Sequence, residues 1–376
     1  MPQYNCVFCT QPFLADEALA GREVACPRCG TRNLLPSLVP PTIKIPKPTA
    51  AAGQEPVASQ VSALTSRIID NMERVIVGKR TEITLVVMAY LAEGHVLLED
   101  VPGVAKTMLA RALAGSIGGE FKRIQCTPDL LPNDITGSSI FNPKTTEFVF
   151  RRGPLFAQIV LADEINRATP RAQAALLEAM AERKVTADGN NYALTPPFLL
   201  IATQNPVDHE GTFPLPEAQL DRFLVRLSLG YPGLENEVSM LQRLRVDHPI
   251  DSLATVATAD DVLACQKAVR EVHADEKVVR YIVQLIRATR EHYDLLLGGS
   301  PRASMALLHC AQAYAAIQGY DFISPDDVKH IAPHVLGHRL ILRPESRLRK
   351  KTVRTVLEEV LNTVPVPPTP AAGFAP

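Results

Sequence analysis

A short segment of the chain carries residues suited to binding phosphate groups. Asp100-Val-Pro-Gly-Val-Ala-Lys-Thr107 follows an apolar stretch and precedes an apolar helix. Backbone N–H groups in such a turn, together with the amino end of the helix, attract anions. Lys106 would reach the β- and γ-phosphates of a nucleotide, and the Thr107 hydroxyl would hold Mg²⁺. The predicted nucleotide-binding residues of this loop are Val101, Pro102, Gly103, Val104, Ala105, Lys106 and Thr107.

The match of this loop to the pattern G-x-x-x-x-G-K-[ST] is imperfect. Asp100 and Ala105 stand where the two glycines are expected. Taken alone, the segment could also be a strand–turn–helix corner with a surface lysine. The assignment therefore depends on residues further along the chain.

Two adjacent carboxylates follow a later apolar run, Ile159-Val-Leu-Ala162. Carboxylates at the end of a buried strand are costly unless they face a metal ion or water. Here Asp163 would support Mg²⁺ and Glu164 would activate the water that attacks the γ-phosphate. Acidic pairs at strand ends are common, but this pair comes one helix–strand unit after Lys106. That order favours a nucleotide-hydrolysing site.

Three more polar residues come after the pair. Asn205 ends the next apolar run, where an amide can orient an attacking water, although an Asn-Pro pair also starts turns. Arg222 ends a predicted helix just before the chain leaves the first folded region, and Arg302 lies at the start of a later helix opened by proline. Either arginine could instead be a structural surface residue.

Four cysteines near the amino terminus have metal-ligand spacing. Two Cys-x-x-Cys pairs, Cys6 with Cys9 and Cys26 with Cys29, can place four thiolates around one Zn²⁺. About thirty residues bury too little apolar surface to fold alone, so a structural zinc would supply the folding free energy. Redox-active cysteine pairs are the alternative. Balanced local charge favours protein docking over nucleic-acid contact for this predicted zinc ribbon.

Composition limits the remaining possibilities. The chain has 376 residues, enough for two cores, and a formal net charge of −1, so no overall attraction to nucleic acid or to a membrane is expected. No apolar run approaches the ~18 residues that span a bilayer. The start of the chain has no signal-peptide pattern, and the cysteine usage fits a reducing compartment. These features predict a cytoplasmic protein without a membrane span.

The elements that must position these residues alternate along the chain. Apolar strands at 95–99, 158–162 and 198–203 alternate with helices at 107–117 and 171–183, a pattern typical of a parallel sheet flanked by helices. Beyond Tyr231 the periodicity is helical. We expect an α/β fold with a helical second domain. The predicted domains are a zinc ribbon at 1–35, a Pro/Ala-rich linker at 36–60, an α/β core at 61–230, a helical lid at 231–362 and a disordered tail at 363–376.

Together these motifs resemble those of MoxR AAA+ ATPases. The segments that carry the resemblance begin at His95 (HVLLEDVPGVAKT), Ala162 (ADEINRA), Thr203 (TQNP), Gly211 (GTFPLPEAQLDRF) and Ser300 (SPRA), in the family's order. The likeness covers about Val61 to Leu361. It implies a P-loop AAA+ core with a helical lid, ATP as substrate and Mg²⁺ as cofactor, and the zinc ribbon would be an addition.

The resemblance also implies roles for single residues. Asn205 looks like the family's sensor residue, Arg222 like a finger that reaches the neighbouring subunit's γ-phosphate, and Arg302 like the lid arginine that contacts its own nucleotide. Val77 and Gly78 look like the segment near the adenine, although a buried helix end is an equal alternative. A finger acting between subunits requires a closed ring, expected to be a hexamer. Members act as chaperone-like ATPases on protein partners, often von Willebrand factor A-domain proteins.

Two inserts and two other functions complete the expectations. Ser138 to Gly153 and Lys184 to Thr195 are predicted to project toward the ring pore or one face, the second as a hairpin turning at Asp188-Gly189. A helicase-like or chelatase-like motor is the first alternative function. It is supported by a basic cluster made of Arg339, Arg343, Arg347, Arg349, Lys350, Lys351 and Arg354. The second is a nucleotide-gated binding module with little turnover.

Overall fold

The structure, a computed structural model, describes residues 3–5, 12–14, 23–25, 27, 29, 32–34, 57–206, 211–245 and 248–367. The chain forms two compact units, Met1–Thr49 with Ala371–Pro376 and Ala50–Pro370. The first contains two antiparallel strand pairs: β1 (Gln3–Asn5) with β2 (Pro12–Leu14), and β3 (Glu23–Ala25) with β4 (Arg32–Leu34). Of the four predicted zinc ligands, Cys6, Cys9 and Cys26 lie outside the described residues, and Cys29 is exposed.

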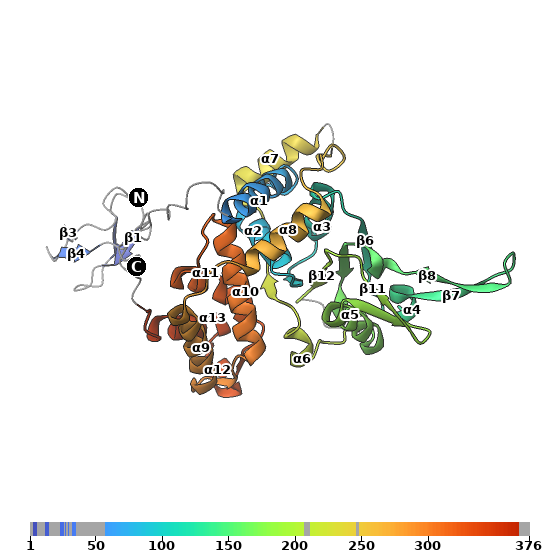
Figure 1. The fold of residues 1–376 in the computed structure, drawn as a ribbon. Helices are drawn as coiled ribbons and strands as arrows, with labels where there is room; N and C mark the ends of the chain where they lie inside the picture. The colour runs from blue at the N-terminus through green and yellow to red at the C-terminus, as the bar shows by residue number, and fades with distance from the viewer. Residues whose placement is uncertain are drawn as a thin grey trace, which may run out of the picture. The chain divides into compact units, whose positions relative to one another are not determined.

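A five-stranded parallel sheet forms the centre of the second unit (Figure 1). Its order is β13-β5-β12-β9-β6. The strands are β5 (Val96–Glu99), β6 (Phe121–Gln125), β9 (Ile159–Asp163), β12 (Leu199–Gln204) and β13 (Val225–Leu227). Strand β12 lies between β5 and β9, with Ile201 opposite Val96 and Leu161. Because all five strands are parallel, their carboxyl ends share one edge.

Helices cover both faces of this sheet, as the apolar strands predicted. Val96 and Leu98 face one cluster, which includes α1 (Val57–Glu73), α2 (Arg80–Leu91) and α3 (Lys106–Ser116). Leu97 faces the other, which includes α5 (Pro170–Glu182). A strand buried on both faces has apolar residues at consecutive positions. Short helices α4 (Pro132–Thr136) and α6 (Glu217–Leu220) and the turns η2 (Pro154–Phe156) and η3 (Ile165–Arg167) complete this part.

The described residues beyond the sheet form helices and one short strand pair. The helices are α7 (Leu234–Leu244), α8 (Ala259–Arg270), α9 (Glu276–Glu291), α10 (Pro301–Ile317), α11 (Pro325–Leu336), α12 (Pro344–Leu348) and α13 (Val353–Thr363). Strand β14 (Leu295–Leu297) pairs with β15 (Ile341–Leu342), an addition that the sequence did not indicate. Because α10 packs against α1, α2 and α11, the lid helices share a hydrophobic cluster with one face of the sheet.

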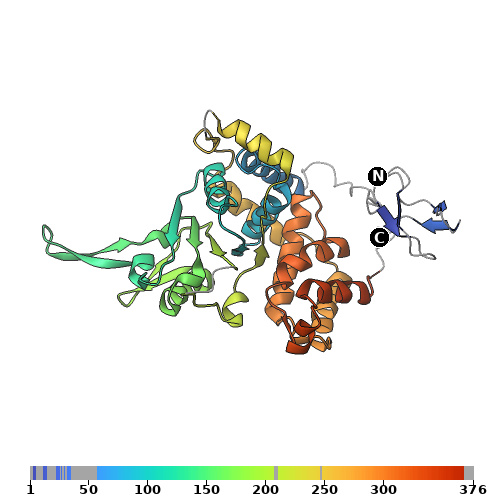
Figure 2. The ribbon, with the colours of Figure 1, turned by 180° about the vertical axis from the view of Figure 1, so that it is seen from behind.

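Both inserts are antiparallel hairpins. Strand β10 (Lys184–Ala187) pairs with β11 (Asn190–Ala193), and the turn residues Asp188 and Gly189 have φ of 50° and 75°. Two positive φ values suit the Asp-Gly pair, which confirms the predicted hairpin. Strand β7 (Gly137–Asn142) pairs with β8 (Glu147–Arg152), and this hairpin extends away from the body of the second unit in both views (Figures 1 and 2).

Candidate functional site

The predicted phosphate loop joins β5 to α3 at the carboxyl edge of the sheet. Ala105, the residue before α3, has φ of 64°, a left-handed conformation that side chains rarely adopt. Gly103 has φ of 87°, and a Cβ there would meet nothing within 4 Å. No described side chain caps the amino end of α3, whereas Ser300, Ser324 and Thr352 cap their helices. The first N–H groups of α3 thus remain available for an anion.

Asp100 is buried, and its carboxylate does not face the open side of the loop. One oxygen accepts from the backbone N–H of Gly230 at 2.7 Å and from the Ser228 hydroxyl at 3.1 Å. These residues follow β13 and lead toward the lid. Lys106 Nζ donates to the backbone carbonyl of Asp100 at 2.7 Å. Partial burial lowers the pKa of Lys106, while nearby carboxylates oppose that shift. Asp100 therefore anchors the loop to the segment entering the lid.

The acidic pair lies where β9 ends, held by Thr203 of the neighbouring strand. The Thr203 hydroxyl donates to Asp163 Oδ1 at 2.6 Å and accepts from the backbone N–H of Glu164 at 2.8 Å. Arg123 of β6 donates to Asp163 Oδ2 through Nη2 at 2.6 Å. Glu164 has φ of 58°, and the side chains of Arg167 and Gln125 donate to its Oε2 at 3.4 and 3.3 Å. Backbone strain of this kind collects at functional sites.

Asn205 follows β12 directly and lies between the two other predicted groups. Strand β12 is hydrogen-bonded to β5 on one side and to β9 on the other, with Gln204 opposite Glu99. The backbone N–H of Asp100 donates to the carbonyl of Gln204 at 3.1 Å. The phosphate loop, the acidic pair and Asn205 thus meet at one edge of the sheet, as predicted from three separate sequence positions.

Val77 and Gly78 lie in the turn between α1 and α2, Val77 half-buried and Gly78 exposed. Gly78 has φ of +70°, and a Cβ added there would lie 2.1 Å from Nδ2 of Asn236 in α7. Lys79 Nζ next to it donates to the carbonyl of Tyr231 at 3.2 Å. This turn therefore contacts the first lid helix, and the glycine is required by that close approach.

The two predicted arginines lie on other parts of the second unit. Arg222 is exposed just after α6, and its Nη1 donates to the carbonyl of Leu177 in α5 at 3.2 Å. Arg302 is exposed in the first turn of α10. Among the described residues, no hydrogen bond or ion pair joins either arginine to Lys106 or Glu164. Within one chain, Arg222 therefore contacts α5 and not the carboxyl edge of the sheet.

The donor set at the sheet edge fits a magnesium nucleotide. The ammonium group of Lys106 and the uncapped amino end of α3 suit phosphate oxygens. The Thr107 hydroxyl and the carboxylates of Asp163 and Glu164 are the hard oxygen donors that Mg²⁺ prefers. No zinc fit can be drawn for the amino-terminal cysteines, because three of the four lie outside the described residues.

The sequence did not identify three residues around this site. Thr203 begins the TQNP motif, but a threonine at this position does not by itself indicate that it bridges Asp163 and Glu164. Arg123 lies in β6, an edge strand with mostly exposed side chains that lacks the apolar run of the others. Arg339, assigned to a basic surface cluster, is 8% exposed and pairs with Asp221 at 2.7 Å. The one sequence signal for its burial is that Arg339 lies next to apolar residues within an arginine-rich stretch.

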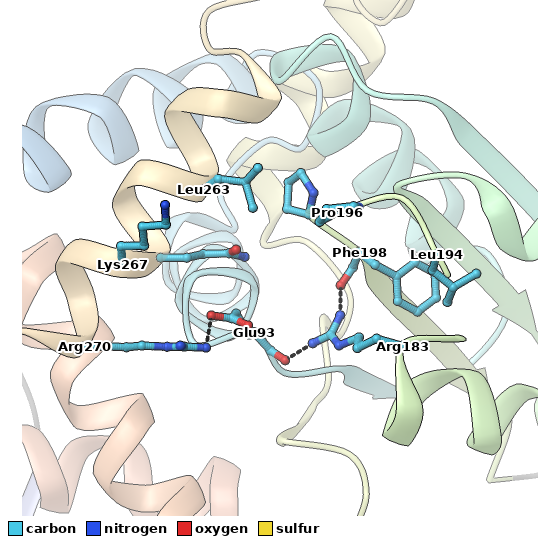
Figure 3. Close-up of a pocket in the computed structure, with 10 residues that line it drawn as sticks. Glu93, Arg183, Leu194, Pro196, Phe198, Leu263, Lys267 and Arg270 are labelled. Atoms are coloured by element: carbon cyan, nitrogen blue, oxygen red, sulfur yellow. Dashed lines mark hydrogen bonds and ion pairs between the residues drawn. The ribbon is translucent and has the colours of Figure 1, made fainter. Parts of the chain in front are cut away.

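A separate pocket of about 260 Å³ lies at the opposite, amino-terminal edge of the sheet (Figure 3). The Arg183 guanidinium donates there to the carbonyls of Phe198 and Glu93, and Arg270 pairs with the Glu93 carboxylate (Figure 3). Since β5 and β12 begin beside this pocket, the full sheet separates it from Lys106. Arg183, Glu93 and Arg270 are bound to one another or to the backbone, so the candidate site is the carboxyl edge.

Known proteins resemble this chain over most of its length. Residues 95–225 match the ATPase family associated with various cellular activities (AAA), and residues 287–360 match the AAA lid domain. Chaperone MoxR1 of Mycobacterium tuberculosis is 40% identical over 84% of this chain and 85% of its own length. Protein MoxR of Methylorubrum extorquens is 31% identical over 80% of this chain and 95% of its own.

Two other similarities extend this relationship. The uncharacterized protein YeaC of Bacillus subtilis is 50% identical over 81% of this chain and 95% of its own length. A crystal structure from Cytophaga hutchinsonii, described as that of a candidate ATPase, superimposes with a TM-score of 0.78 at 36% identity, covering 83% of this chain and 97% of that one. The chain therefore belongs to the MoxR family of AAA ATPases.

Proposed function

We propose that this chain hydrolyses ATP at the carboxyl edge of its sheet and uses the energy to remodel a protein partner. The observation that carries the proposal is the convergence of Lys106, the Asp163–Glu164 pair and Asn205 on one edge, next to an uncapped helix end. Family membership supports ATPase activity in general. The roles of single residues are part of the proposal.

The chain's own groups would divide the work of phosphoryl transfer. Lys106 and the N–H groups of α3 hold the β- and γ-phosphates, and Thr107 and Asp163 hold the cation. Mg²⁺, when bound, neutralises phosphate charge and orients its oxygens. Glu164 accepts a proton from the attacking water, which Asn205 helps to orient. Val77 and Gly78 lie beside the base, and Arg302 senses the nucleotide from the lid.

Arg222 would act on the neighbouring subunit in a ring, for which six subunits is the family expectation. Its exposure and its separation from Lys106 within one chain support this arrangement. An arginine that stabilises transition-state charge contributes about 10³–10⁵-fold to the rate. Steady-state hydrolysis should rise cooperatively with protein concentration and collapse in both Glu164→Gln and Arg222→Ala. Undiminished hydrolysis in Glu164→Gln would refute the assigned chemistry.

A protein is the proposed substrate, with a von Willebrand factor A-domain protein as the specific expectation. The relative named Chaperone MoxR1 supports this class of function. We propose that the β7–β8 hairpin projects toward the ring pore or one face and moves with nucleotide state. Its residues Phe141 and Phe148 are 48% and 74% exposed. Large exposed aromatic side chains mark contact surfaces. Replacing both with serine should abolish partner-stimulated hydrolysis while basal hydrolysis persists.

We also propose a structural Zn²⁺ in the amino-terminal unit. Strands β1 and β2 flank Cys6 and Cys9, and β3 and β4 flank the second pair, so each Cys-x-x-Cys motif lies in a hairpin connection. That is the arrangement of zinc knuckles. One zinc per chain should be found by metal analysis and lost in Cys26→Ser. The reducing cytoplasm, which such a site needs, also suits the buried thiols of Cys126, Cys265 and Cys310.

A nucleotide-gated module with little turnover is the second candidate. It is favoured by the ion pair between Arg123 and Asp163. The Arg123 guanidinium there occupies the carboxylate that would otherwise bind the cation. ATP binding without turnover at any concentration would support it. The nucleic-acid alternative loses support, because Arg339 is buried and Lys351 pairs with Asp294 and Glu359. Salt-sensitive DNA binding would restore that alternative, as would DNA-stimulated hydrolysis.

A further inference from the structure

The carboxylate of Asp221, next to Arg222, is bound by two residues of the lid. Arg339 Nε donates to its Oδ1 at 2.7 Å, and the Ser300 hydroxyl donates to its Oδ2 at 3.2 Å. Ser300 caps α10 and stands two residues before Arg302. Both oxygens of one side chain are therefore held from the lid, while the next residue, Arg222, is exposed and donates to the carbonyl of Leu177 in α5.

Arg339 is inserted into the segment that carries Arg222. Its guanidinium also donates to the carbonyls of Asp221, Phe223 and Leu224, the last two at 2.7 and 3.1 Å. Only 4% of the Arg339 side chain is exposed. Burial lowers its pKa, and the Asp221 carboxylate opposes that shift. A buried guanidinium with this many partners fixes the backbone around it in one geometry.

Neighbouring lid residues bind the same segment. His338 Nε2 lies 3.0 Å from the carbonyl of Phe223, and Arg226 Nη2 donates to the carbonyl of Gly337 at 2.8 Å. Arg226 also pairs with Glu99, the residue before the phosphate loop, at 2.9 Å. The lid segment 337–339 is therefore joined through hydrogen bonds to residues 221–226 and, through them, to the nucleotide-binding edge.

Apolar packing fixes the chain after Arg222, where Phe223, Leu224 and Val225 are buried, but contributes less before it. Helix α6, which ends one residue before Asp221, has no buried residue. A cavity of about 650 Å³, lined by residues of α6 and of the lid, lies beside the contact. On this side of Arg222, directional hydrogen bonds to Asp221 therefore matter more for placement than apolar packing does.

We propose that Asp221 is a positioning residue that couples the lid to the Arg222 finger. When the lid moves, Ser300 and Arg339 move Asp221 with it. The position of Asp221 then sets where Arg222 meets the neighbouring subunit. This inference rests on the proposed role of Arg222 between subunits. In this arrangement the nucleotide state sensed near Arg302 in one subunit controls hydrolysis in the next. Among the links between the lid and this segment, the Asp221 carboxylate is the one next to Arg222 that a side-chain substitution can remove.

The test mixes two kinds of inactive subunit. Asp221→Ala should retain nucleotide affinity, because its own phosphate site is intact, but lower kcat on the order of 10²-fold, as expected for a misplaced group. Mixed with Glu164→Gln, whose finger is intact, its hydrolysis should rise several-fold, because a neighbour now supplies the finger. Asp221→Asn, which can still accept from Arg339, should keep more activity than Asp221→Ala.

Controls separate this inference from the function on which it rests. Arg222→Ala mixed with Glu164→Gln must also recover hydrolysis; failure there would overturn the finger and the coupling together. Recovery with Arg222→Ala but not with Asp221→Ala would overturn the coupling alone, as would unchanged kcat in Asp221→Ala.

If Asp221→Ala does not fold, Ser300→Ala replaces it as the test variant. Ser324→Ala is its control, because it also removes the side chain that caps a lid helix. Only Ser300→Ala should lower kcat and be rescued by mixing. Equal kcat in the two variants would refute the proposal.

Discussion

Thr203 makes the most informative single test of the site. Its side chain is fully buried, and its hydroxyl both donates to Asp163 and accepts from the backbone N–H of Glu164. Valine has nearly the same shape but can do neither. Thr203→Val therefore removes two hydrogen bonds at the acidic pair without creating a cavity.

The size of the effect is set by these two bonds. A hydrogen bond to a charged group contributes about 1.5–3 kcal/mol, and a buried N–H left without a partner costs about 1–3 kcal/mol. Thr203→Val should thus lower the free energy of unfolding by about 2.5–6 kcal/mol. Because the Glu164 backbone loses its anchor, kcat should fall by about 10²-fold. The Thr203 hydroxyl bonds to Asp163 and Glu164 and not to Lys106 or its loop, so nucleotide affinity should change little.

Denaturant unfolding, nucleotide binding and steady-state hydrolysis measure these three quantities. Thr65→Val is a matched control, because Thr65 is also fully buried but bonds only to carbonyls of its own helix α1. It should leave kcat unchanged. A Thr203→Val protein with wild-type stability and wild-type kcat would refute the reasoning. Lower stability with normal kcat would make Thr203 a structural residue only.

Three other substitutions test the geometry. Ala105→Gly should relieve the left-handed backbone at 105 and raise the free energy of unfolding by up to about 1 kcal/mol in a denaturant titration, so a loss would contradict the assigned strain. Gly78→Ala should displace Asn236 and weaken nucleotide binding, measured by equilibrium titration, and unchanged affinity would argue against a role beside the base. Burial, together with the nearby charge of Arg183, lowers the pKa of His95 from 6.5 to about 3, and the ring Nδ1 accepts from the Leu200 N–H. The contribution of the neutral ring to the free energy of unfolding is complete above pH 6.5 and is lost as pH falls toward 3, by about 1.4 kcal/mol per pH unit. The free energy of unfolding of His95→Gln, measured by denaturant titration, should therefore depend less steeply on acid pH.

Local sequence predicted most of the strands and helices and suggested the chemistry that we propose for the site. Consecutive apolar residues in β5 predict a strand buried on both faces, and the Asp188-Gly189 pair predicts its hairpin, because each pattern reflects backbone preference within a few residues. The phosphate loop and the acidic pair were recognisable for the same reason: their residue types and spacing are local. The strand β6 was missed because an edge strand alternates with polar residues and carries no apolar run.

Only the tertiary structure decided which distant side chains meet. The placement of β12 between β5 and β9 brings Thr203 onto Asp163, which lies forty residues away in the sequence. Arg339 looked like one member of a basic surface, yet the fold buries it against Asp221 from another part of the chain. The periodicity of apolar residues indicates which face of a helix or strand is buried, but not which distant residues contact that face. Those contacts depend on the order of the strands in the sheet and on how the lid packs against them.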